Sequence, residues 1–336
     1  YLSYWVGGLM SKVRCQTKKH EFTVDYPEAV KFADDQASVF WPHNEVKVHK
    51  DKQDILVNMS ESERHGTITV LKLFTKYEQI IGDEFWINFV FKKFPRPADI
   101  QPMAALFGAM ELQVHGKFYA KLNEELGLAT NDFYNEYLED PELKERIDFL
   151  QGTLKKDDLR ALGCFTFGEG AVLYSSFAYL KHFQSQGKNK LVNVVSGINF
   201  SARDEALHSE AAAWLFRTLL QEKQQANLIS IEEVESLEKD IYEAAQIVFE
   251  HEKLIIAKIF SKGKIDGITD KQLEHFAQSR INLCLRNLGY KNLFKVEYNP
   301  IQDWFYKGIN GYQMQDFFNS QGNQYTRDWD THGFSV

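Results

Sequence analysis

The stretch SARDEALHSEA, residues 201–211, has the composition of a helix, because it combines Ala, Arg, Glu and Leu and contains neither Gly nor Pro. Glu205 and His208 lie three residues apart in it, so both side chains project from one helical face about one turn apart. Such a pair forms a solvated or hydrogen-bonded contact about as readily as it binds a metal ion. Further ligands on other helices are therefore needed before this stretch predicts a metal site.

The composition indicates a large globular protein. The chain has 336 residues, of which 44% are hydrophobic and 14% aromatic, so we expect a substantial core. Its 47 acidic residues outnumber its 39 basic ones and give a formal charge of −8, which argues against a nucleic-acid partner. The three cysteines, Cys15, Cys164 and Cys284, include no CxxC pair, so the sequence indicates neither a disulfide framework nor a thiolate zinc site.

Neither a membrane partner nor secretion is expected. No apolar run reaches the roughly 20 residues that a membrane span needs. The chain starts with YLSYWVGGLM, which has neither an initiator Met nor the pattern of a signal peptide, so we expect residues to be missing upstream. Because the cysteines are few and unpaired, a reducing, cytoplasmic location is expected.

From about residue 61 the chain is predicted to be helical. Only seven prolines interrupt it, and connections such as KFPRPADIQP separate long segments that show no β alternation. Helices are expected near residues 61–92, 100–126, 132–151, 156–186, 188–222, 230–263 and 268–287. Several exceed the globular average of about 11–12 residues, which is typical of a bundle of long helices. Residues 1–60 are expected to be mixed, with turns, and the chain after about residue 298 to be a tail without a helical stripe.

Other carboxylates and a second histidine lie in these predicted helices. Glu111 and His115 share one helical face, Glu78 lies in YEQIIGDE, and Glu169 lies in an otherwise apolar and aromatic segment. Burying a lone carboxylate is costly unless it is paired or binds a metal ion. Together with SARDEALHSEA these segments offer four carboxylates and two histidines on four helices, as a dinuclear carboxylate site requires. An oxygen-rich set with two imidazoles suits iron or manganese.

Each part of this constellation also has a simpler interpretation. Glu–His pairs at helical spacing are common, and the pair in FEHEKL, Glu250 and His251, lies on a charged helix and is given no function. Glu169 alone fits a buried hydrogen bond as well as a metal ligand. Only the combination, on four helices in the order of a bundle, favours the metal site.

The segment ARDEALH, residues 202–208, resembles the radical-generating small subunit of class I ribonucleotide reductase, a family of the ferritin-like superfamily. SVFWPHNEV, YEQIIGDE and EGAVLYSSF are similar to further segments of that family along nearly the whole chain. The resemblance implies an all-α, ferritin-like bundle of long helices over residues 1–310, with residues 1–60 packed on it and extra helices around a four-helix core. That core would hold the dinuclear site, with six ligands: Glu78, Glu111, His115, Glu169, Glu205 and His208.

The resemblance also implies that the site oxidises a tyrosine. HGKFY places Tyr119 four residues after His115, where the family has its radical tyrosine. Leu173 and Phe177 stand at positions that line the radical pocket. A dinuclear centre, di-iron in the first place with dimanganese or mixed manganese–iron as alternatives, would react with oxygen and leave a tyrosyl radical. Without the resemblance, Tyr119 reads as a packed core tyrosine.

Radical transfer to a partner subunit is implied in the same way. Trp41 and Asp204, together with His115, would form the exit path from the metal centre. Residues 311–336 would be a tail that docks on the large, catalytic subunit, and Tyr325 in FFNSQGNQY would pass the radical on. The complex would reduce ribonucleoside diphosphates to deoxyribonucleotides for DNA replication, and the small subunit would be a homodimer.

Two positions depart from the family pattern. The family usually has Asp where this chain has Glu78. Its motif is Glu-x-x-His, whereas Glu111 and His115 are four residues apart, and Leu112, at the three-residue spacing, cannot bind a metal. An α-helix brings residues four apart onto one face as well, and a π-bulge would absorb one extra residue. Glu111 is therefore kept as a ligand.

Three other functions fit parts of the pattern. A di-metal oxidase or oxygenase acting on a small organic or fatty-acid-like substrate would share the ligands, but has no use for a tyrosine-bearing tail. A ferritin-like iron store would have no use for Trp41 or Tyr119. In a purely structural helical protein, the six residues would pair among themselves.

Overall fold

The computed structural model describes residues 13–309, apart from the side chains of residues 75, 137 and 138. This part of the chain is built from helices and turns, with one isolated antiparallel bridge between Ile265 and Ile268. The all-α prediction is therefore confirmed. The α-helices are α1 (Pro27–Ser38), α2 (Glu61–Gln79), α3 (Phe91–Lys93), α4 (Ile100–Ala109), α5 (Gly116–Glu125), α6 (Asn131–Glu139), α7 (Pro141–Thr153), α8 (Asp158–Gly170), α9 (Tyr174–Ser185), α10 (Val192–Gln225), α11 (Ile231–Ile259) and α12 (Asp270–Leu288).

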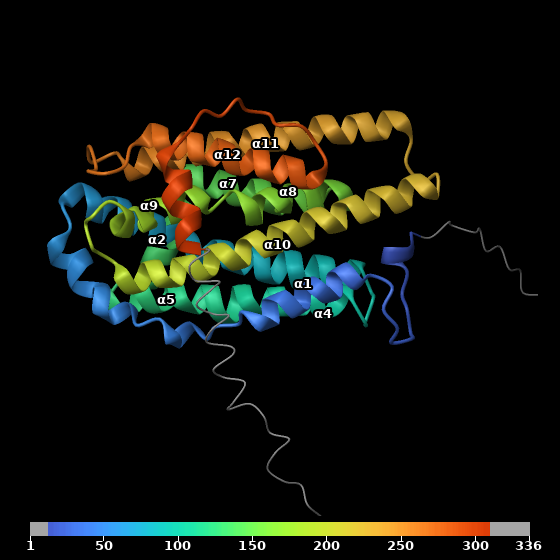
Figure 1. Ribbon diagram of the computed structural model, residues 1–336, viewed down its shortest axis with the longest axis horizontal. Coiled ribbons are helices and arrows are strands. Elements are labelled where there is room, and N and C mark those ends of the chain that lie inside the picture. Colours follow the sequence, from blue (N-terminus) through green and yellow to red (C-terminus); the bar gives the residue numbers. More distant parts are fainter. Residues whose placement is uncertain (1–12, 310–336) are drawn as a thin grey trace, which may run out of the picture.

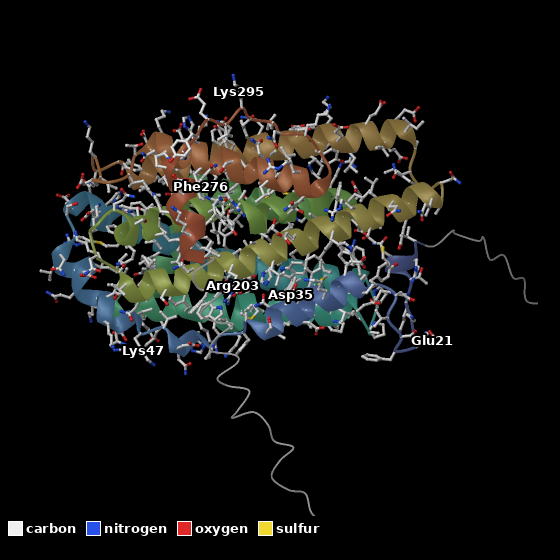
Figure 2. All side chains as sticks on the ribbon, in the orientation of Figure 1. Glu21, Asp35, Lys47, Arg203, Phe276 and Lys295 are labelled. Atoms are coloured by element: carbon white, nitrogen blue, oxygen red, sulfur yellow. The ribbon has the colours of Figure 1, made fainter. Side chains whose placement is uncertain are left out.

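The long helices lie side by side along the long axis of the molecule (Figure 1). In this view α11 and α12 run along one side, α1, α4 and α5 along the other, and α8 and α10 between them. α10 packs extensively against α8 and also contacts α9 and α12. Side chains fill the space between the ribbons: Phe276 is buried inside, whereas Lys47 and Lys295 point outward (Figure 2). In the described part, no helix is long and apolar enough to cross a membrane.

Capping residues set the start of several helices where the sequence predicts them. Ser60, Ser230 and Thr269 each form a reciprocal capping box at the N-terminus of α2, α11 and α12. α12 ends at Gly289, whose φ of 95° lies in the left-handed region that glycine adopts without strain. α11 and α12 therefore begin and end within about four residues of the predicted bounds, whereas α2 begins as predicted and the helical stretch continues through η5 and α3 to Lys93.

Two predicted helices are each divided in two. The helix expected over 132–151 breaks between α6 and α7, because Pro141 occupies the first position of α7 and Asp140 caps that helix through its side chain. The helix expected over 156–186 breaks at residues 171–173, where Ala171 has a φ of −134°. Glu169 consequently lies in the last turn of α8.

Two helices were not predicted. α1 lies in the region expected to contain turns, and it packs on α4 and α10. Residues 300–309 are also helical, although no helical stripe was recognised there. Phe305 of this helix is buried and packs on Phe276 of α12. This apolar contact anchors the short helix on the bundle.

Two π-helical segments interrupt the α-helices next to the bundle centre. η5 (Ile80–Val90) continues α2, and η6 (Met110–His115) joins α4 to α5. The two segments approach so closely that a Cβ at Gly82 would lie 2.8 Å from the Cβ of Glu111. A Cβ at Gly108 would lie 2.6 Å from the side chain of Ile87. Glycine at both positions therefore permits η5 to pack closely against α4 and η6.

Candidate metal centre

Four glutamates and two histidines meet in the middle of the bundle. Glu78 comes from α2, Glu111 and His115 from η6, Glu169 from α8, and Glu205 and His208 from α10. None of these side chains is more than 1% exposed. The structure thus brings together all six residues that the sequence analysis names as ligands.

Their ligand atoms form two overlapping sets. In the first, atoms of Glu78, Glu111, His115 and Glu205 lie within 4.8 Å of one another. In the second, atoms of Glu111, Glu169, Glu205 and His208 do so. Glu111 and Glu205 belong to both sets. Two metal ions held by these sets would each have one histidine and one glutamate of their own and would share Glu111 and Glu205.

Many of these atoms have no hydrogen-bond partner. Both carboxylate oxygens of Glu78 and of Glu205, Oε2 of Glu169, Oε1 of Glu111 and Nδ1 of His208 are buried and unsatisfied. His208 Nδ1 lies 2.5 Å from Glu111 Oε1, but the geometry is not that of a hydrogen bond. Buried acceptors that converge without donors are costly. The donor set therefore fits metal cations, and its oxygen-rich character suits iron or manganese.

The ionisation of the glutamates reflects the same crowding. Burial, reinforced by the charge of Glu111, raises the pKa of Glu78 well above its usual value. Burial and the charges of Glu205 and Glu111 do the same to the pKa of Glu169. Burial alone would also raise the pKa of Glu111, but the charges of His115 and His208 hold it well below its usual range. Four carboxylates this close need protons or metal cations among them.

The π-helical turn accounts for the unusual spacing of Glu111 and His115. The backbone N–H of Gly116 donates to the carbonyl of Glu111, five residues before it, as in a π-turn. His115 Nδ1 lies 2.9 Å from Glu111 Oε2 and faces the other ligands. Leu112, at the three-residue spacing, is 39% exposed and turned away. The extra residue is thereby accommodated without removing either ligand from the site.

The outer nitrogens of both histidines have partners of their own. Asp204 Oδ2 is 3.0 Å from His115 Nε2 and accepts a hydrogen bond of 2.8 Å from Trp41 Nε1. His208 Nε2 is 2.8 Å from Gln36 Oε1. Such partners fix the orientation of an imidazole whose other nitrogen binds metal. Trp41 and Asp204 were named from the sequence, whereas Gln36, on the unpredicted helix α1, was missed.

Trp86 is a second residue that sequence reasoning missed. Its indole N–H donates to Glu169 Oε1, and its ring packs edge-on against His208 and Phe107. It therefore orients one terminal glutamate and covers one histidine. The signal in the sequence is its position eight residues after Glu78, because residues eight apart lie on about the same face of a regular helix.

Tyr119 lies beside the metal centre in an aromatic pocket. Its ring centroid is 4.4 Å from that of Phe74 and 4.9 Å from that of Phe118, and Phe74 in turn contacts Phe177. The phenol is 1% exposed and its oxygen has no hydrogen-bond partner. Burial, followed by the charge of Glu78, raises its pKa well above the usual value. Leu173 is buried at the break before α9.

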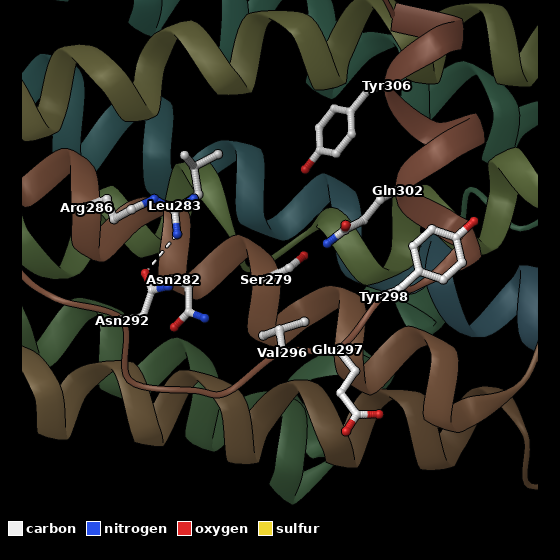
Figure 3. Close-up of a pocket in the computed structure, with 10 residues that line it drawn as sticks. All are labelled: Ser279, Asn282, Leu283, Arg286, Asn292, Val296, Glu297, Tyr298, Gln302 and Tyr306. Carbon is white, nitrogen blue, oxygen red and sulfur yellow. Dashed lines mark hydrogen bonds between the residues drawn. The ribbon is translucent and has the colours of Figure 1, made fainter.

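Two other features stand apart from this centre. A surface cavity of about 390 Å³ lies between α12 and the segment that follows it (Figure 3), where Arg286 donates to Asn292 at 2.8 Å. None of the six candidate ligands lines it. Tyr325 and the predicted tail, residues 311–336, lie outside the described residues, so their roles stay predictions.

Comparisons with known proteins agree with this geometry. Residues 19–300 match the model of the family "Ribonucleotide reductase, small chain". The chain is 23% identical to the "Probable ribonucleoside-diphosphate reductase small subunit 048L" of Invertebrate iridescent virus 3, over 97% of this chain and 90% of that protein. It is 28% identical to the ribonucleoside-diphosphate reductase subunit beta of Halalkalibacterium halodurans, over 69% of this chain and 68% of that one.

A solved structure has the same fold. The dimanganese(II)-NrdF protein of Streptococcus sanguinis superimposes with a TM-score of 0.72, at 20% identity, over 87% of this chain and 99% of that one. A likeness at this identity shows the fold alone. The family match, which spans most of the chain, shows more: the chain belongs to the family of ribonucleotide reductase small chains.

Proposed function

We propose that this protein is the small subunit of a class I ribonucleoside-diphosphate reductase, and that it generates and stores a tyrosyl radical on Tyr119. The observation that carries the proposal is the pair of ligand sets that share Glu111 and Glu205, with Tyr119 in a closed aromatic pocket beside them. The names of the relatives in the family support the same reaction.

The six residues of the two sets would hold two metal ions, which we propose to be iron, with manganese or a mixed pair bound by the same ligands. When bound, the two ions supply the oxidising power, drawn from oxygen, that a phenol side chain requires. The protein contributes the geometry. Glu111 and Glu205, which belong to both sets, would hold both ions, and Asp204 and Gln36 hold the imidazoles in the tautomer that leaves each Nδ1 free to bind.

Tyr119 would give up one electron, together with its phenolic proton, to the oxidised metal centre and remain as a neutral radical. The radical survives only where water and reductants are excluded. Phe74 and Phe118 pack directly on the ring, and Phe177 closes the pocket behind Phe74. Tyr119 is 1% exposed, so its phenol is shielded from solvent.

A hydrogen-bonded path leads away from the centre. Asp204 Oδ2 joins Trp41 Nε1 to His115 Nε2, and the Trp41 and His115 rings lie 5.9 Å apart, nearly parallel. Burial would raise the pKa of Asp204, but the hydrogen bond from His115 lowers it, so the carboxylate stays ionised as an acceptor. We propose that the oxidising equivalent follows this path and then Tyr325 into the large subunit. A homodimer acting in the cytoplasm would complete the assembly.

The test combines metal analysis with electron paramagnetic resonance after aerobic reconstitution. We expect two ions per chain, one for each ligand set, and a tyrosyl signal that is lost in Tyr119→Phe. The matched control is Tyr179→Phe, because Tyr179 is equally buried but donates its hydroxyl to Glu63 O and lies in none of these contacts. Two bound ions with no tyrosyl signal in any variant would reject the radical function and favour a di-metal oxidase.

A further inference from the structure

Two buried hydroxyl groups near the metal centre lack hydrogen-bond partners. One is the phenol of Tyr119, and the other is the hydroxyl of Ser201 on α10, which is 0% exposed. A buried hydroxyl without a partner loses its hydrogen bonds to water and gains nothing in return. Two such groups in one region therefore raise the question of whether they face each other.

The packing of η6 and α5 on α10 answers this question. Glu111 lies opposite His208, with 2.5 Å between Oε1 and Nδ1. One turn further along η6, His115 lies opposite Glu205, with 3.1 Å between Nδ1 and Oε1. From the first contact to the second, residue numbers increase along η6 and decrease along α10. The two elements therefore run antiparallel and pair turn by turn.

The next matching turn contains the two hydroxyl groups. Tyr119 is four residues after His115, and Ser201 is four residues before Glu205. One turn beyond Ser201 on α10, a Cβ at Gly197 would lie 2.4 Å from the ring of Phe118, the residue before Tyr119. The turn of α10 that carries Ser201 therefore packs against the turn of α5 that carries Tyr119, next to the contact between Glu205 and His115. Consistently, the Ser201 hydroxyl lowers the pKa of Tyr119, against the larger effect of burial, which raises it.

The geometry points to Ser201 as the hydrogen-bond partner of Tyr119, a positioning residue that holds the phenol in the tyrosine state and the phenoxyl oxygen in the radical state. Only the contact to the radical rests on the proposed function; the hydrogen bond to the intact phenol does not. A serine hydroxyl both donates and accepts. It can accept from the phenolic O–H and, after Tyr119 has lost its electron and proton, turn to donate to the phenoxyl oxygen. Ser201 itself gains and loses neither electron nor proton.

A hydrogen bond from Ser201 would affect the radical in two measurable ways. It draws spin density from the phenoxyl oxygen, which lowers the largest g value of the radical and adds a coupling to an exchangeable proton. It also stabilises the radical, because the phenoxyl oxygen is a hydrogen-bond acceptor that would otherwise be buried without a donor. The remaining wall of the pocket is aromatic, so Phe74 and Phe118 offer no replacement donor.

The first experiment uses the metal-free protein labelled with tyrosine carrying ¹³C at Cζ, whose chemical shift reports hydrogen bonding of the phenol. Tyr119→Phe assigns the resonance. Ser201→Ala should shift it, whereas Ser176→Ala should not, since Ser176 is a buried serine without a partner on α9 and not opposite Tyr119. An unshifted Tyr119 resonance in a folded Ser201→Ala protein would overturn the proposal.

The second experiment uses the reconstituted protein and high-field paramagnetic resonance. Ser201→Ala should raise the largest g value, remove the exchangeable-proton coupling and shorten the lifetime of the radical. The two experiments separate the two claims. A shifted ¹³C resonance without any radical in the wild type would support the Ser201 contact and reject the proposed function of Tyr119. A radical with unchanged g value and coupling in Ser201→Ala would reject the Ser201 contact and support the radical function.

Discussion

Replacing Asp204 by Asn keeps the shape of the side chain but removes its ability to satisfy its neighbours. One carboxylate oxygen accepts from Trp41 at 2.8 Å and lies 3.0 Å from His115 Nε2. The other accepts from Gln36 at 3.3 Å and lies 3.4 Å from Arg203. An asparagine amide has one oxygen, which accepts, and one NH₂ group, which donates. In either orientation the NH₂ group therefore faces two neighbouring groups that also donate. The variant must therefore lose one side of this network.

The size of the effect follows from the kind of hydrogen bond that is lost. A hydrogen bond to a charged group contributes about 1.5–3 kcal/mol, and about 1.4 kcal/mol corresponds to a factor of ten. We therefore expect Asp204→Asn to lower the rate of ribonucleotide reduction per tyrosyl radical by about 10- to 100-fold. The assay measures turnover with the large subunit in excess and divides it by the radical content of the same sample.

A matched variant separates this effect from general damage to the fold. Asp51→Asn changes a buried aspartate that accepts from Asn193 and from the backbone N–H of Val194, away from the metal centre. It should leave turnover per radical unchanged. If Asp204→Asn also kept the wild-type value, the path through Trp41, Asp204 and His115 would not carry the oxidising equivalent.

Three further predictions concern a residue beside the metal centre, an ion pair at the start of α2 and a close contact between helices. Trp86→Phe keeps the ring packing but removes the hydrogen bond to Glu169, and should weaken metal binding about 10- to 100-fold in a metal titration. Burial raises the pKa of Glu63, but two lysines lower it to about 2 from 4.5. Glu63→Gln should therefore cost about 1–2 kcal/mol in urea unfolding at pH 7, after solvent screening, and this cost should disappear as the pH falls below about 4.5 toward 2, where the native carboxylate is protonated too. Gly82→Ala should lower stability by about 1–3 kcal/mol and reduce metal content, because its Cβ would press on η6. Gly152→Ala, with no atom within 4 Å of the new Cβ, should not.

The candidate ligands could be named from the sequence because local chemistry makes several of them conspicuous. Glu205 and His208 share a face of a helix whatever the rest of the chain does, and Glu169 has only apolar neighbours, which makes a buried carboxylate conspicuous. Their convergence required only that the predicted long helices form a bundle. The bundle was predictable for the same reason, since length and apolar periodicity are properties of each segment.

The parts that could not be predicted depend on contacts between segments. Gln36 and Trp86 are ordinary residues in the sequence and acquire a role only because an imidazole nitrogen and a carboxylate oxygen face them. A π-bulge at Glu111 was one of the two ways to accommodate the four-residue spacing, but nothing local signalled its close approach to Gly82, 29 residues earlier. The break at residues 171–173 contains no proline, and its local sign, Gly168 and Gly170 just before it, is weak inside an otherwise apolar and aromatic segment.

The two shared glutamates have a consequence for how the centre fills. The first ion to bind would pull Glu111 and Glu205 into place and reduce the repulsion among the four carboxylates, so the second ion would meet a nearly finished site. Loading should therefore be cooperative, and a limiting amount of metal should produce a mixture of fully loaded and empty chains instead of a population with one ion each. Because burial and the neighbouring carboxylates raise the pKa values of Glu78 and Glu169, and a metal-bound carboxylate is deprotonated, loading should also release protons and acidify an unbuffered solution.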